Sequence, residues 1–159
     1  MKKTKIIQSN ITKEIKNLKN HKKKIIFTNG CFDLVHPGHI HYLKKAKTFG
    51  DILIVAINSD KSIKKLKGIN RPIISWKDRA EIIAALESVD YVIKMDEDTP
   101  KNLIKKIKPH IHVKGGDYKR KELPEYQTVV NLGGKVKIIP VLKGYSTSNI
   151  ISKINRVKK

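Results

Sequence analysis

The sequence predicts an α/β protein built around a doubly wound parallel sheet of five strands. Two observations support this prediction. Five short apolar segments, rich in β-branched residues, recur along the chain, and each is followed by a segment with amphipathic helical spacing. Parallel strands buried on both faces appear as continuous apolar runs, and their alternation with helices produces right-handed crossovers.

Local signals delimit the elements in chain order. The predicted strands cover residues 25–27, 51–58, 89–93, 110–113 and 136–141. The first strand ends at the turn signal Asn29-Gly30, and Pro37 suits the first turn of a helix that ends near Gly50. Between the second and third strands, Ser59 and Ser75 each have the residue type of a helix N-cap.

The later helices are delimited in the same way. Thr99-Pro100 begins a helix that Pro109 ends, and a helix through about residues 122–132 ends at paired glycines. A last helix follows residues 144–148 and has an apolar face of Ile150, Ile151 and Ile154. Ligands of such sheets bind beyond the carboxyl ends of the strands, where the unusual loops of this chain converge.

We interpret residues 1–24 as a basic N-terminal extension and residues 25–159 as the main domain. Within the extension, Ile11, Ile15 and Leu18 recur at helical spacing, which predicts one short amphipathic helix. We expect this helix to pack on the domain or on a partner subunit. A solvated extension is the alternative.

The formal net charge of +21 is high for 159 residues and has two explanations. The 35 basic residues include only four arginines, the lysines are spread along the chain, and aromatic stacking platforms are sparse. This pattern is typical of compositional bias from A+T-rich coding. The other explanation is attraction of phosphate substrates with some affinity for nucleic acid. We expect no specific nucleic-acid partner.

Other features indicate a cytoplasmic protein without a membrane span. No apolar run approaches the roughly 18–20 residues that cross a bilayer. No signal-peptide pattern is visible at the N-terminus. Cys31 is the single cysteine, which excludes an intramolecular disulfide and fits a reducing compartment.

The segment from Ile25 to His39 predicts an anion site. A buried strand, a loop containing glycine and a helix start place free N–H groups and the positive end of the helix dipole at one point. His36 and His39 lie three residues apart on that first turn and add two imidazoles. A metal pair or two surface histidines is the general alternative.

These residues carry a family resemblance. The segment His36-Pro37-Gly38-His39 resembles the His-x-Gly-His signature of nucleotidyltransferases, and residues 28–33 resemble the cytidylyltransferase-like branch. Further similar segments in family order are 66–72, 86–90, 98–100, 113–118 and 144–151. The chain is most similar to the heptose 1-phosphate adenylyltransferase domain of ADP-heptose biosynthesis. The resemblance covers about residues 25–155 and implies a Rossmann-like fold.

The resemblance also implies a reaction and a set of site residues. A sugar 1-phosphate would attack the α-phosphorus of ATP, accompanied by Mg²⁺, and release pyrophosphate. The implied catalytic residues are His36, His39 and Lys47. The implied nucleotide-binding residues are Thr28, Asn29, Gly30, Phe32, Gly38, Lys114, Gly115, Asp117, Ser146 and Thr147. The implied sugar-phosphate ligands are Asp33, Arg71 and Arg79. No metal ligand from the protein is expected.

Several alternatives stay open at this point. Instead of binding a ligand, Asp33 could simply form a turn, since aspartate is common in turns. Arg71 and Arg79 could likewise be solvated surface residues. Val141 and Leu142 stand where related glycerol-phosphate cytidylyltransferases carry Arg-Thr, which favours the heptose group. CTP or another sugar or polyol phosphate is the alternative substrate, and a non-catalytic nucleic-acid-binding module is the alternative of another class. We expect a homodimer and a separate sugar kinase that supplies the substrate.

Overall fold

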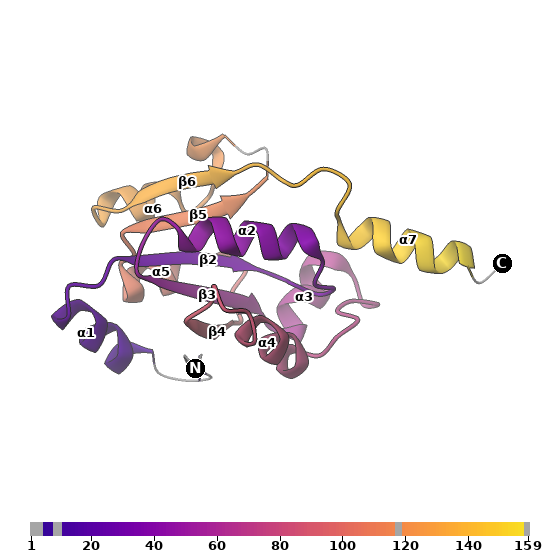
Figure 1. Cartoon of the computed structure of the whole chain (residues 1–159), viewed down its shortest axis with the longest axis horizontal. Coiled ribbons are helices and arrows are strands. Elements are labelled where there is room, and N and C mark those ends of the chain that lie inside the picture. Colours follow the sequence, from indigo (N-terminus) through magenta and orange to yellow (C-terminus); the bar gives the residue numbers. More distant parts are fainter. Residues whose placement is uncertain (1–4, 8–10, 117–118, 158–159) are drawn as a thin grey trace.

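The computed structural model describes residues 5–7, 11–116 and 119–157, which form a parallel sheet with helices on both faces (Figure 1). The strands are β1 (Lys5–Ile7), β2 (Ile25–Gly30), β3 (Ile52–Asn58), β4 (Tyr91–Met95), β5 (Ile111–Gly115) and β6 (Lys135–Ile139). Their spatial order is β1-β4-β3-β2-β5-β6, and every pairing is parallel. The predicted α/β class is confirmed.

The helices are α1 (Thr12–Asn20), α2 (Pro37–Lys47), α3 (Asp60–Lys67), α4 (Trp76–Ala84), α5 (Lys101–Ile107), α6 (Tyr126–Asn131) and α7 (Thr147–Val157), with a short 3₁₀ turn η1 (Arg120–Glu122). The predicted helix at 122–132 therefore begins later, at Tyr126, after the separate turn η1. The predicted strand at 136–141 is displaced by one residue at its start and ends at Ile139.

The extension contributes a strand that the sequence analysis did not predict. β1 pairs with β4 at the edge of the sheet, with Ile6 opposite Val92, so the sheet has six strands rather than five. Three residues, of which only Ile6 and Ile7 are apolar, carry too little pattern to be recognised, and the pairing with β4 defines the strand. The predicted helix is present as α1, and its Ile15 and Leu18 are buried in the same core as the sheet.

Two hydrophobic layers lie on opposite faces of the sheet because successive strand residues point to opposite sides. Phe27 of β2 packs in the layer covered by α1, α5 and α6. Its neighbour Ile26 packs in the other layer, beneath α2 and α4. The central strands β2 and β3 are almost wholly buried, as their continuous apolar sequences predict.

The strand order determines where a ligand can bind. From β2 the chain proceeds through β3 to β4 on one side and then returns to β5 and β6 on the other. The order therefore reverses between β2 and β5, and the crevice at their carboxyl ends is the expected ligand site. Helix α7 extends away from the sheet in Figure 1, and none of its residues from Thr147 to Val157 is buried. Within the described residues, no helix is both long and apolar enough to span a bilayer.

Candidate active site

A cavity of about 380 Å³ lies at this switch point, above the ends of β2 and β5. The sequence-predicted residues that line it are Asn29, Gly30, Phe32, His36, Gly38, His39, Lys114, Gly115, Ser146 and Thr147. They come from three stretches of the chain, 29–39, 114–115 and 146–147, which the fold brings to the carboxyl ends of the strands. Asp117 lies outside the described residues.

Two stacked imidazoles stand at the start of α2. The rings of His36 and His39 are nearly parallel, with their centroids 3.8 Å apart, and Phe32 packs against His39 at 5.1 Å. His36 is extended and its carbonyl accepts the backbone N–H of His39, so the helix begins between the two residues. A side chain at Gly38 would meet the His36 ring at 3.0 Å, which explains the glycine between them.

The surroundings of both imidazoles disfavour their protonated forms. Burial lowers the pKa of His36. Burial, together with the charges of His36 and Lys67, lowers the pKa of His39 to about 4. A neutral imidazole can donate one hydrogen bond without the cost of a buried charge. A bound polyanion would favour the protonated form, so the pair can strengthen its contacts as negative charge arrives.

Lys114 is positioned by a buried acidic residue. Its ammonium donates to Asn29 Oδ1 at 3.2 Å and lies 3.8 Å from Glu125 Oε1. The same carboxylate oxygen is 2.9 Å from His112 Nε2, and His112 and Glu125 are both buried. Burial raises the pKa of Glu125, but its hydrogen bond with His112 and the charge of Lys114 outweigh burial and lower it. The carboxylate therefore stays charged and holds Lys114 at the cavity.

The floor of the cavity is tied together by Tyr42. Its hydroxyl is 2.6 Å from Thr28 Oγ1 and donates to the carbonyl of Val113 at 2.9 Å, so it joins β2 to β5. Its ring lies 3.2 Å from where a side chain at Gly115 would begin, which explains that glycine. Thr28 is fully buried within β2 and does not line the cavity, contrary to the prediction that it contacts the nucleotide.

Helix α7 begins at the same cavity. Ser146 accepts the backbone N–H of Asn149 at 3.0 Å and so caps the helix start. Thr147 donates to the carbonyl of Leu34 at 3.4 Å, which ties the helix to the loop before His36. The N-terminal ends of α2 and α7 thus both meet the cavity, and helix N-termini favour anions.

The prediction that Lys47 reaches a phosphate is wrong. The residue lies at the far end of α2, next to Asp51 and Asp90, which directly precede β3 and β4. It is therefore at the amino ends of the strands, whereas the cavity is at their carboxyl ends. There its ammonium pairs with Asp90 Oδ2 at 2.6 Å and donates to the carbonyl of Asp51. Eight residues of helix separate it from His39, a rise of about 12 Å.

The prediction for Arg79 is also wrong. Its side chain is fully buried, and its three guanidinium nitrogens are engaged. They donate to the carbonyls of Ile74 at 2.9 Å, Cys31 at 2.5 Å and Asn58 at 2.9 Å. Nη2 also pairs with Asp60 at 2.7 Å. Arg79 therefore joins the loops that leave β2 and β3 and does not reach a substrate.

Asp33 is an anchor for the neighbouring loop. Its Oδ1 accepts the backbone N–H groups of Ile73 and Ile74, at 2.8 and 3.1 Å, and its Oδ2 accepts Arg71 Nε at 2.5 Å. Burial raises the pKa of this carboxyl, but these hydrogen bonds outweigh burial and hold the pKa below its usual value. The prediction that Asp33 binds substrate is therefore wrong, whereas Arg71 keeps part of its guanidinium free of Asp33.

The residues at the site that were not predicted include Tyr42, Lys67 and Glu125. Tyr42 and Lys67 line the cavity, and Glu125 supports it through Lys114. Lys67 had a sequence signal, since it lies in a segment that resembles the family loop. Glu125 is brought to Lys114 only by packing, so its local sequence gave no sign of this role.

The described residues of the cavity offer no set of side chains that would hold a metal ion. None of the described residues that line it carries a carboxylate. Across the described part of the chain, no group of three His, Cys, Asp or Glu side chains is placed to hold a metal. The lining instead offers imidazole, ammonium and backbone donors, which suit phosphate oxygens.

Comparisons with known proteins agree with this geometry. The family model described as cytidylyltransferase-like matches residues 27–153. The chain is 49% identical over 140 residues to the bifunctional protein HldE of Geotalea uraniireducens. The aligned region covers 88% of this chain and 29% of that protein. The chain is also 50% identical over 146 residues to HldE of Helicobacter pylori, with 92% and 31% covered. The chain thus spans less than a third of the length of these relatives.

Solved structures give the same answer for the fold. The lipopolysaccharide core biosynthesis protein of Thermoplasma volcanium matches with a TM-score of 0.63 and 32% identity, over 78% of this chain and 99% of that one. Pantoate-beta-alanine ligase of Francisella tularensis matches with a TM-score of 0.58 at 18% identity, over 98% and 79%, and shows the shared fold alone.

The fold, the cavity and these matches define a nucleotidyltransferase enzyme. The chain belongs to the cytidylyltransferase-like family, as residues 28–33 together with the segment from His36 to His39 predicted.

Proposed function

We propose that the enzyme transfers AMP from ATP to D-glycero-D-manno-heptose 1-phosphate and forms ADP-heptose and pyrophosphate. The observation that carries the proposal is the stacked pair of His36 and His39 at the N-terminus of α2, inside a cavity whose described lining residues include no carboxylate. The identity of about 50% to HldE proteins over most of this chain supports the choice of substrate.

In the proposed reaction, a phosphate oxygen of the sugar 1-phosphate attacks the α-phosphorus of ATP. The new phosphorus–oxygen bond forms as the bond to the β-phosphate breaks, and the electron pair leaves with pyrophosphate. His36 and His39 donate hydrogen bonds to the phosphoryl oxygens on which charge develops. Lys67 and Lys114 offset the charge of the triphosphate, and the starts of α2 and α7 add backbone donors.

Mg²⁺ enters this proposal with its substrate. The cavity lining lacks carboxylates among its described residues, so the ion would be bound by the triphosphate oxygens. No step assigned to the protein depends on a metal ligand from the chain.

Pyrophosphate release tests the proposal directly. ATP, CTP, GTP and UTP are each supplied with heptose 1-phosphate in both anomers and with glycerol 3-phosphate. We expect activity with ATP and one heptose anomer. His36→Ala should lower kcat about 10²- to 10³-fold, the usual effect of removing one donor to a developing oxyanion.

His41→Ala is the matched control, because His41 lies on the same helix but is exposed and does not line the cavity. It should keep the wild-type rate. Turnover with CTP or glycerol 3-phosphate alone would reject the proposed substrates. Absence of turnover, with sequence-selective nucleic-acid binding at physiological salt, would favour a binding module.

We also propose a homodimer. Ile154 and Val157 on α7 are 50% and 86% exposed, which leaves the end of this amphipathic helix uncovered. Light scattering over a range of concentrations should give a mass of two chains. A mass of one chain at all concentrations would contradict this.

A further inference from the structure

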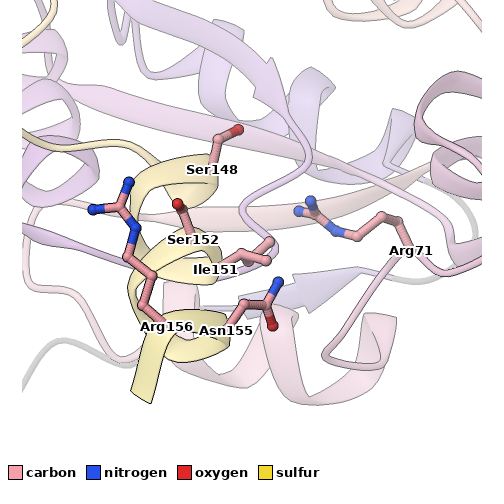
Figure 2. A pocket seen from close by; sticks show the side chains of 6 residues that line it. All are labelled: Arg71, Ser148, Ile151, Ser152, Asn155 and Arg156. Atoms are coloured by element: carbon pink, nitrogen blue, oxygen red, sulfur yellow. The ribbon is translucent and has the colours of Figure 1, made fainter. Parts of the chain in front are cut away.

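A second cavity, of about 540 Å³, lies between α7 and the loop that carries Arg71 (Figure 2). The residues that line it are Arg71, Ser148, Ile151, Ser152, Asn155 and Arg156. Ser148 also lines the first cavity, so the two cavities meet at the start of α7. A ligand in the second cavity would therefore border a nucleotide in the first.

The lining has a definite chemical character. It combines two guanidinium groups, two hydroxyls and one amide with a single aliphatic side chain, and none of these described residues is acidic. Guanidinium groups bind phosphate through paired hydrogen bonds. Hydroxyl and amide groups both donate and accept, as the hydroxyls of a sugar do. The lining thus suits a phosphorylated polyol.

Arg71, which lines the second cavity, has one guanidinium nitrogen without a hydrogen-bond partner among the described residues. Asp33 holds the Nε of Arg71 at 2.5 Å, and Asp33 is itself fixed by two backbone N–H groups. Arg71 Nη2 is buried and has no hydrogen-bond partner among the described residues. A donor without a partner is costly. Because Arg71 also lines the second cavity with its side chain 17% exposed, an acceptor bound there would meet the part of the guanidinium that Asp33 leaves free. In Figure 2 the guanidinium extends toward α7, on the side of Ile151 and Asn155.

We propose that this second cavity is the binding site of the acceptor, a sugar 1-phosphate, and this inference rests on the proposed function. Arg71 binds the acceptor phosphate and holds it at the boundary with the nucleotide cavity. Ser152, Asn155 and Arg156, further along α7, contact the sugar end. Asp33 acts as a positioning residue, because it determines how the guanidinium of Arg71 is presented.

The test measures the KM of each substrate separately in the full chain. Arg156→Gln and Ser152→Ala replace exposed side chains on α7, so folding should be unaffected. We expect the KM for heptose 1-phosphate to rise about tenfold in Arg156→Gln, with the KM for ATP unchanged. Arg71→Lys keeps the charge but loses the guanidinium fork, and should raise the same KM at least as much.

Arg120→Gln is the matched control, since Arg120 is an exposed arginine on η1 outside both cavities. It should leave both KM values unchanged. An active enzyme whose acceptor KM is the same in wild type, Arg156→Gln and Arg71→Lys would overturn the inference and leave the proposed function intact.

The opposite failure is also distinguishable. If the enzyme uses glycerol 3-phosphate instead of heptose 1-phosphate, a raised KM for that acceptor in the same variants would support the site while rejecting the substrate. If no acceptor is turned over, calorimetry with heptose 1-phosphate decides. Binding that is lost in Arg156→Gln supports the site, and absence of binding to the wild type overturns it.

Discussion

Replacement of Arg79 by methionine should destabilise the fold strongly. The side chain is fully buried and donates to three backbone carbonyls, those of Cys31, Asn58 and Ile74. Methionine fills much of the volume but donates nothing, so these carbonyls lose their charged donor. Its acidic partner Asp60 is partly exposed and can be solvated after the change, so it adds little to the cost.

The magnitude follows from the three carbonyls. Each buried acceptor left without a partner costs about 1–3 kcal/mol. Three of them, taken in the lower half of this range, lower the free energy of unfolding by about 3–5 kcal/mol. For a chain of this size each kcal/mol shifts Tm by about 2–4 °C, so Tm should fall by about 6–20 °C.

Denaturant unfolding and calorimetry measure both quantities, with Arg120→Met as the control at an exposed arginine. The control should lie within about 0.5 kcal/mol of wild type. If Arg79→Met lost less than about 1 kcal/mol while the KM for the sugar phosphate rose, Arg79 would be a ligand. The structural role assigned here would then be refuted.

Three further predictions concern other charged groups. Lys47→Met should lower the free energy of unfolding by about 1–3 kcal/mol, because its partner Asp90 is buried. The KM for ATP should stay unchanged, and a raised KM would show that Lys47 binds the nucleotide after all. Glu125→Gln should raise the KM for ATP about tenfold, because it removes the charge that holds Lys114 at the cavity. Glu122→Gln, at an exposed residue, is the control. Equal KM values in the two variants would contradict the role of Glu125 in positioning Lys114. The pKa of His39 is about 4 when folded and near 6.5 when unfolded, so the unfolded chain binds the proton first as pH falls. Stability should decline from about pH 6.5 to 4, and His39→Gln should decline less in denaturant titrations; identical profiles would refute the low pKa.

The sequence predicted the architecture because each central strand is apolar along its whole length. Segments such as Leu53–Ile57 are buried on both faces, so their pattern needs no tertiary information. β1 escaped prediction for the opposite reason. It has three residues, and its partner β4 supplies the hydrogen bonds that define it. Residue pattern alone does not contain such a pairing.

The candidate site was predictable where function and local geometry coincide. His36, Gly38 and His39 occupy one helical turn, and the turn itself brings the imidazoles together. The charged residues were less predictable. Lys47 has the right charge on the right helix but lies at its far end, and Arg79 has the right chemistry but is saturated by backbone carbonyls. Their partners come from distant segments, which only the fold reveals.

Transfer of a labelled phosphate tests the central claim most directly. The enzyme is given heptose 1-phosphate with ATP labelled at the α-phosphorus in one reaction and at the γ-phosphorus in another. The account predicts that the α-label enters the sugar nucleotide and that the γ-label leaves in pyrophosphate, with both transfers slowed in His36→Ala. Appearance of the γ-label on the sugar, or equal transfer by wild type and His36→Ala, would contradict it.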